Sequence, residues 1–85
     1  MTRLSSEGEP IEVWGNQALP EGFSWQGVQH RILEISNRWR VDTRWWEPGQ
    51  SVSRDYLKVI TATGHLCLIY RDARSDRWYL ARLYD

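Results

Sequence analysis

The 85-residue chain is predicted to be mainly β, with a single small antiparallel sheet of five or six strands, curved or closed as a small barrel. Apolar and polar residues alternate in several short runs, and Gly, Asp and Pro fall between these runs. Six Trp and four Tyr supply the large side chains that a small core needs. Curvature is expected because so few strands cannot enclose a core in a flat sheet.

The first part of the chain is expected to contain a tail and two short strands. Residues 1–9 are rich in Ser, Glu and Gly, which predicts a flexible tail, and residues 10–85 are predicted to form a single β domain. Residues 11–13 and 23–25 alternate as strands do. A loop is predicted between them, because residues 15–22 hold Asn, Pro and two Gly, and Gln26-Gly27 is typical of a tight turn.

The segment from residue 28 to residue 41 fits two structures. In a helix, Val28, Ile32, Ile35 and Trp39 would share one face. In a strand, Val28 and Ile32 have the opposite parity to the later apolar residues, so a bulge or sharp bend is needed near Glu34. We favour a long bent strand because the neighbouring segments are predicted strands. The alternative is an α+β fold with residues 28–40 helical.

The second half of the chain shows the most regular pattern, and it predicts a three-stranded meander. Residues 54–61 and 78–84 alternate, while residues 66–70 form the continuous apolar run of a central strand. Turns are predicted at residues 63–64 and 72–76. The residues expected to contribute to the core are Trp39, Val59, Leu66, Leu68, Tyr70, Trp78 and Leu80.

The formal net charge is zero, but the charges are unevenly distributed. Residues 1–27 carry one basic and four acidic side chains, and residues 28–85 carry ten basic and seven acidic ones. A chain without excess cations is a poor candidate for strong non-specific DNA binding. The single cysteine, the polar N-terminus and the lack of a long apolar run predict a cytoplasmic protein with no disulfide, signal peptide or membrane contact.

Catalytic and metal-binding patterns are weak. His65 and Cys67 would share a face of a strand, and His30 could join them, but no CxxC or HxxxH spacing is present. Cys67 lies between apolar residues, which is typical of a small buried hydrophobe rather than a nucleophile. We therefore predict a non-enzymatic protein that needs no metal and no cofactor.

Arginine and aromatic residues are interleaved through the last fifty residues, as in Arg38-Trp39-Arg40 and Arg77-Trp78-Tyr79. The predicted binding site is Arg44, Trp45, Trp46 and Arg54, because a short loop carries two adjacent indoles next to two cations. Such a surface can bind single-stranded nucleic acid, with aromatic rings stacking on bases and arginines contacting phosphates. The alternative is a protein–protein interaction adaptor that uses Trp and Arg as a hot spot.

Several segments together resemble a known family. They are Pro10-Ile11-Glu12-Val13, Phe23-Ser24-Trp25-Gln26-Gly27, Trp45-Trp46, Arg54-Asp55-Tyr56 and the run from Arg77 to Asp85. Over residues 10–85 the chain resembles a small uncharacterised bacterial domain. This domain occurs alone and, in a related form, at the C-terminus of the inactive Y-family polymerase-like subunit of the bacterial mutasome. The resemblance implies a role in DNA damage tolerance through protein or DNA contacts, and it implies no catalytic residues.

Overall fold

The structure of the chain is a computed structural model, and it describes residues 2–16, 18–43 and 52–84. These residues form six antiparallel strands in one closed barrel, in the order β1 to β6, and no helix is present among them. The fold class predicted from the sequence is therefore confirmed. The strands are β1 (Thr2–Gly15), β2 (Pro20–Trp25), β3 (Val28–Thr43), β4 (Val52–Thr61), β5 (Leu66–Asp72) and β6 (Arg77–Tyr84).

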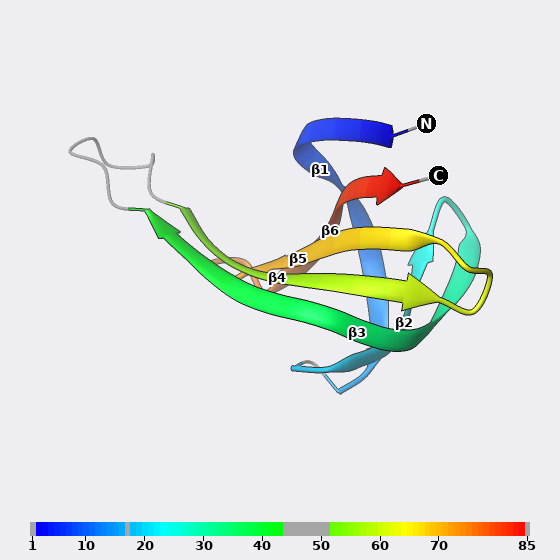
Figure 1. The fold of residues 1–85 in the computed structure, drawn as a ribbon. Helices are drawn as coiled ribbons and strands as arrows, with labels where there is room; N and C mark the ends of the chain where they lie inside the picture. Colours follow the sequence, from blue (N-terminus) through cyan, green and yellow to red (C-terminus); the bar gives the residue numbers. More distant parts are fainter. Residues whose placement is uncertain (1, 17, 44–51, 85) are drawn as a thin grey trace.

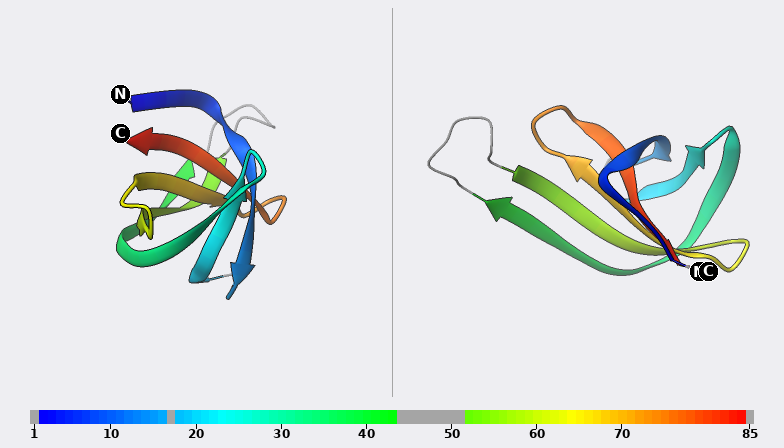
Figure 2. Two further views of the ribbon diagram at one scale, coloured as in Figure 1. Left: turned by 90° about the vertical axis from the view of Figure 1, so that its right-hand side faces the viewer. Right: turned by 90° about the horizontal axis from the view of Figure 1, so that it is seen from above.

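Two long strands close the barrel because each of them pairs with two neighbours along its length. The first part of β1 pairs with β6 and its last residues pair with β2. In the same way, the start of β3 pairs with β2, and the rest of β3 pairs with β4. Figures 1 and 2 show the result: a small barrel from which the β3–β4 hairpin projects, with the two chain termini side by side.

The ambiguous segment at residues 28–40 is strand, so the helical alternative is wrong. The pairing of β3 with β4 shifts register between Ile32 and Glu34 and again between Ile35 and Asn37. A bulge adds one residue and reverses the parity of the side chains that follow. Consequently both Ile32 and Ile35 pack against the core. The bulge or bend that the strand interpretation predicted near Glu34 is thus confirmed.

The turn between β2 and β3 also follows the prediction. Gln26 and Gly27 have φ angles of 51° and 77°, and Trp25 pairs directly with Val28. Two consecutive residues with positive φ are characteristic of the tight turns whose twist matches that of a hairpin. Gly27 adopts this conformation at no steric cost.

The N-terminal segment differs from the prediction, because Thr2–Glu9 belongs to β1 rather than to a separate tail. Leu4 pairs with Arg82 and Glu9 pairs with Leu80, with an irregularity between Leu4 and Glu9. The composition of the segment indicated a tail, but β6 would otherwise have a row of unpaired backbone groups on this side. The sheet therefore begins earlier than the sequence indicated.

The core lies inside the barrel and draws on all six strands. Its buried members are Ile11, Phe23, Leu57, Val59, Cys67, Ile69, Trp78 and Leu80, and half-buried Ile32 and Ile35 of β3 pack against them.

Of the predicted core residues, Val59, Tyr70, Trp78 and Leu80 are buried as expected. Leu66 and Leu68 are only half-buried and Trp39 is exposed, so these three assignments were wrong. In β5 every residue from 66 to 70 is apolar, and alternation therefore gave no sign of which face points inward.

The inward face of β5 can be tested by two truncations of similar size. Ile69 is fully buried, so Ile69→Ala should lower the free energy of unfolding by about 2–5 kcal/mol, measured by urea denaturation. Leu66→Ala, on the opposite face of the same strand, should cost clearly less. Equal losses for the two variants would contradict the assigned face.

Candidate functional site

A cleft opens where the β3–β4 hairpin leaves the barrel. The alternation of side chains along each strand explains which residues line it, because directly paired residues lie on the same face of the sheet. Leu57 and Trp78 are on the inward face. Arg38 pairs with Leu57, Arg71 pairs with Trp78, and Asp55 pairs with Arg71, so these side chains are on that face too. Beyond the end of the barrel this face meets solvent, and charged residues replace apolar ones. The cleft has a volume of about 340 Å³ and is lined by Ala18, Arg38, Trp39, Arg40, Asp55, Tyr56, Leu57, Arg71 and Trp78.

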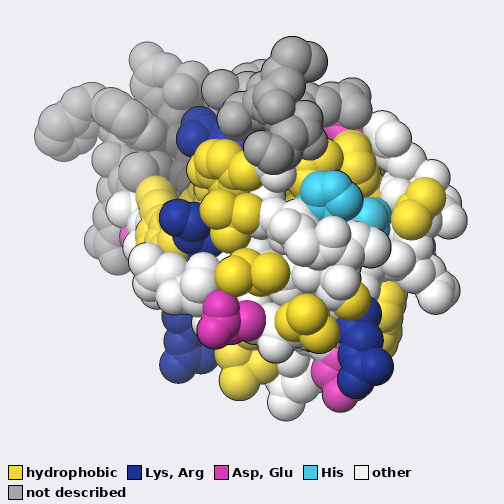
Figure 3. All heavy atoms as spheres, turned by 45° about the vertical axis from the view of Figure 1, so that its right-hand side comes forward, with side chains coloured by type: hydrophobic (Ala, Val, Ile, Leu, Met, Phe, Trp, Pro, Cys, Tyr) yellow, Lys and Arg dark blue, Asp and Glu magenta, His cyan; other side chains and the backbone are white. Residues whose placement is uncertain are grey.

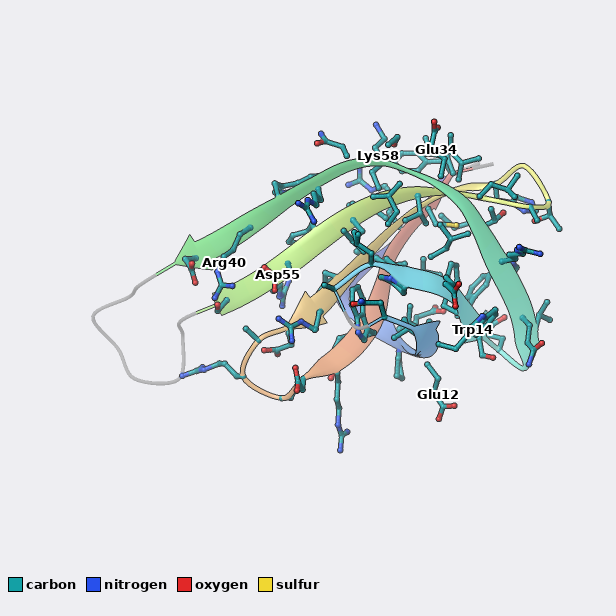
Figure 4. The ribbon with its side chains drawn as sticks, turned by 90° about the horizontal axis from the view of Figure 1, so that it is seen from below. Glu12, Trp14, Glu34, Arg40, Asp55 and Lys58 are labelled. Carbon is teal, nitrogen blue, oxygen red and sulfur yellow. The ribbon has the colours of Figure 1, made fainter. Side chains whose placement is uncertain are left out.

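Asp55 holds two of the arginines in the cleft. Its carboxylate accepts a hydrogen bond from Arg71 Nη2 at 3.0 Å and one from Arg40 Nη1 at 3.3 Å. Arg40 also bonds to Asp42 at 2.8 Å, and Arg71 bonds to Asp76 at 2.6 Å. These contacts raise the pKa of both guanidinium groups, mainly through the bond to Asp42 for Arg40 and through the bond to Asp55 for Arg71. Figure 4 shows Arg40 and Asp55 side by side on the two strands of the hairpin.

The network orients the arginines more than it stabilises the fold. Arg40, Asp42 and Asp76 are more than half exposed, and exposed ion pairs contribute little to stability. Arg38 differs from its neighbours in the cleft, because its guanidinium forms no ion pair or hydrogen bond with a described residue. The guanidinium of Arg38 is therefore available to an anionic ligand, whereas those of Arg40 and Arg71 are paired with aspartates.

The opposite face of the same strands carries a ladder of aromatic rings, one from each strand from β3 to β6. Trp39, Tyr56, Tyr70 and Tyr79 are direct cross-strand partners. The ring centroids are 5.5 Å apart for Trp39 and Tyr56, and 5.2 Å apart for each of the next two pairs. Cross-strand aromatic pairs stabilise a sheet and hold their rings in fixed positions.

Tyr70 is buried although it lies on this outer face. Its ring is flanked by Tyr56 and Tyr79, and the Arg54 guanidinium carbon lies 4.4 Å from the ring centre. The backbone of Gly8 covers its hydroxyl so closely that a Cβ there would lie 2.7 Å from Tyr70 Oη. Burial is the main reason that the pKa of Tyr70 is raised.

Trp39 ends the ladder and is the most accessible of the four rings. Its indole stacks on Tyr56 with an angle of 6° between the planes, and 39% of the residue is exposed. β3 has no second neighbour at this point among the described strands, so no further ring continues the stack. Trp39 is also among the residues at the cleft, and its two neighbours in the chain, Arg38 and Arg40, carry the arginine side chains of the cleft on the other face of β3.

Of the predicted site residues, only Arg54 falls in the part that the structure describes. Arg44, Trp45 and Trp46 lie outside the described residues. Arg54 Nη1 donates to Tyr56 Oη at 3.2 Å, and this bond is the main cause of its raised pKa. Arg54 thus supports the ladder from the outer face rather than lining the cleft.

Sequence reasoning missed the pair at the centre of the site. Trp39 was assigned to the core because it lies in a predicted strand, and Arg38 was not singled out as a binding residue. The triplet Arg38-Trp39-Arg40 carried the signal, because alternation in a strand places its indole on one face and both cations on the other. The sequence did not indicate how far the β3–β4 hairpin extends beyond the barrel, and this extension is what leaves Trp39 exposed.

The residues considered for metal binding or nucleophilic chemistry are arranged unfavourably for it. Cys67 is buried, and burial raises the pKa of its thiol to about 11. A thiol with such a pKa is a poor nucleophile at neutral pH. Among residues 2–16, 18–43 and 52–84, no three His, Cys, Asp or Glu side chains are grouped as metal ligands.

The fold and the site define a class of protein: a small six-stranded barrel with a cleft of arginines and aromatic rings at one end. The chain belongs to the family described as Domain of unknown function (DUF6504), which it matches over residues 1–85. Comparison with the curated proteins gave no significant match, and comparison with the solved structures gave none. Within the described ranges, no helix is long and apolar enough to cross a membrane.

His30 lies outside the cleft and provides a test of the barrel's pH dependence. Its ring stacks on Phe23 at 5.2 Å, and neither ring nitrogen has a hydrogen-bond partner. Burial, and secondly His65, lower its pKa below the ordinary 6.5. The unfolded state therefore binds more protons just below pH 6.5, and the stability that neutral His30 provides is lost as the pH falls through the lowered pKa.

The melting temperature should consequently fall when the pH is lowered from about 8 to about 5. His30→Phe removes the titrating group and should reduce this fall, whereas His65→Gln, at the exposed neighbour, should preserve most of it. A pH dependence that is identical in the wild type and His30→Phe would contradict the role of His30.

Proposed function

We propose that this protein is a non-catalytic binding module for single-stranded nucleic acid, which it holds in the cleft beside Trp39. The observation that carries the proposal is the composition of the hairpin, where three arginines lie close to Asp55 in the cleft and the ring of Trp39 is exposed on the other face of the same strand. Proteins that bind single strands combine these two elements, a cationic groove along the backbone and rings on which bases stack.

Trp39 would provide the stacking platform. One face of its indole is covered by Tyr56, while no described ring covers the other face. A base that stacks there continues the ladder by one more ring, and the ladder holds the indole in place before binding. Stacking of one base on an aromatic side chain contributes about 1–3 kcal/mol, so a single platform supports weak binding.

Arg38 would contact the phosphate next to that base. It precedes Trp39 in the chain and lies on the other face of β3, and no carboxylate among the described residues forms an ion pair with it. Arg40 and Arg71 form ion pairs with Asp55, so they would offer oriented hydrogen-bond donors to the ligand but little uncompensated positive charge. With few free cations and a net charge of zero, the protein should bind nucleic acid with a shallow salt dependence.

Arg44, Trp45 and Trp46 remain part of this proposal. They follow β3 directly in the sequence, so they extend the same Arg and Trp pattern beyond the hairpin strands. The resemblance to a domain of the bacterial mutasome suggests the biological setting, a cytoplasmic role in DNA damage tolerance, where single strands are exposed.

A protein–protein adaptor is the second candidate, and one observation favours it. Two of the three arginines in the cleft are already paired with aspartates, which leaves little free positive charge for the phosphates of a nucleic acid. In that case Trp39 and Arg38 would act as the hot spot for a protein partner.

The proposal predicts different effects for the two central residues, measured with a labelled oligothymidylate of about 12 nucleotides by fluorescence anisotropy. Trp39→Ala should weaken binding roughly 5- to 150-fold and leave the salt slope unchanged, because it removes stacking. Arg38→Ala should weaken binding and lower the slope by about 0.7, because it removes one phosphate contact.

Arg31→Ala is the matched control, since Arg31 lies on the same strand but outside the cleft. It should bind as the wild type does. If the wild-type protein does not bind the oligonucleotide at low salt, the nucleic-acid proposal fails and the adaptor is left. If Arg31→Ala is as weak as Arg38→Ala, binding is diffuse and the cleft is not the site.

A further inference from the structure

β2 and β3 separate beyond their paired stretch at one end of the barrel. The two strands pair only from Gly22 to Trp25 and from Val28 to Arg31. Beyond Arg31, β3 continues along β4, while the start of β2 turns toward β1, where Pro20 pairs with Gly15. A groove of about 370 Å³ lies where the two strands separate, lined by Leu19, Pro20, Glu21, Arg31, Ile32, Leu33, Glu34 and Ile35.

The groove presents apolar side chains to solvent. Leu33 is 66% exposed and Leu19 is 47% exposed, the two most exposed leucines described in the structure. Leu33 points outward because it is the extra residue of the first bulge, between Ile32 and Glu34. Below it, Ile32 and Ile35 are half-buried and contact the core. A ligand in the groove would therefore cover apolar surface that is continuous with the core of the barrel.

The groove also has an open backbone edge. From Ile32 onward, β3 has a strand neighbour only on the β4 side among the described residues. Further along, the edge is partly closed, because the Arg38 amide donates to Asn37 Oδ1 at 2.9 Å. The open stretch thus coincides with the apolar groove. Unpaired N–H and C=O groups beside an apolar groove are the features to which an extended peptide adds as a further strand.

The charges around the groove indicate the chemistry of that peptide. Glu21, Glu34 and Arg31 are exposed, and none of the three forms an ion pair with a residue that the structure describes. The lining therefore has two negative charges and one positive charge. Figure 4 shows Glu34 on β3 well separated from Arg40, which belongs to the arginine cleft. Figure 3 shows hydrophobic side chains reaching the surface next to acidic and basic ones on one face of the molecule.

We propose that this groove binds an extended segment of a partner protein, in which apolar side chains alternate with Lys or Arg. The segment pairs with the open edge of β3 at residues 32–36. Its apolar side chains cover Leu33 and Leu19, and its cations lie near Glu21 and Glu34. This surface is separate from the arginine cleft, so a ligand in one site leaves the other accessible, and the inference does not rest on the proposed nucleic-acid function.

The test uses a fluorescein-labelled octapeptide of alternating Val and Lys, and fluorescence anisotropy with the full chain. The wild type should bind it, and Leu33→Gln should bind at least tenfold more weakly. Val28→Gln is the matched control, because Val28 is also exposed on β3 but lies outside the groove. Glu34→Lys should weaken binding of the Val–Lys peptide and improve binding of a Val–Glu peptide.

Three results would overturn the proposal. One is the absence of binding to the Val–Lys peptide at millimolar concentration. Another is equal binding to a peptide with the same residues in two blocks, which would indicate simple charge attraction. The third is concentration-dependent self-association that Leu33→Gln abolishes without any peptide binding, which would show that the groove takes a second copy of the chain. Arg38→Ala should leave peptide binding unchanged, which separates this result from the test of the cleft.

Discussion

The backbone of β3 is the constraint on which the rest of the structure depends. This strand must first pair with β2 to close the barrel and then with β4 to form the long hairpin. Two bulges make both pairings possible, because each adds a residue and increases the local bend. Without them, either Ile32 or Ile35 would point away from the core, and the barrel would lose apolar contacts that a chain of 85 residues can hardly replace.

Both candidate sites follow from this bent strand. Where β3 leaves β2, the wall opens and the bulged Leu33 is exposed beside an unpaired edge. Where β3 and β4 pass the end of the barrel, the inward face of the sheet becomes a solvent-exposed surface, and Arg38 and Arg40 take the places of core residues. The aromatic ladder matters here because a two-stranded hairpin is only marginally stable on its own. Trp39 stacks on Tyr56, and through Tyr70 and Tyr79 it is linked to the strands of the barrel.

The sequence predicted the barrel, the meander of β4 to β6, the tight turn at Gln26-Gly27 and the bend near Glu34, because alternation and turn residues are local signals. It could not predict which face of β5 is inward, since Leu66 to Tyr70 are all apolar. It also missed the N-terminal strand, whose pairing with β6 depends on residues more than seventy positions away. For the site, the pattern of arginine and aromatic residues was informative, but burial decides whether Trp39 is core or surface, and burial depends on where the barrel ends.

In the proposed function, the charge distribution would make the cleft select its ligand by shape and stacking rather than by net electrostatic attraction. Asp55 neutralises much of the field of Arg40 and Arg71, yet it also fixes the direction of both guanidinium groups. The guanidinium groups would therefore donate hydrogen bonds to a ligand phosphate without rearrangement, although the net positive electrostatic potential of the cleft is weak. In the proposed function, long duplex DNA, which is bound mainly through charge, would gain little from such a site. An unstacked base would gain more, because it would continue the ring stack at Trp39 while its phosphate reached Arg38. Single strands offer such bases and duplexes do not, which is the reason that we propose a single-stranded ligand for a chain with no net positive charge.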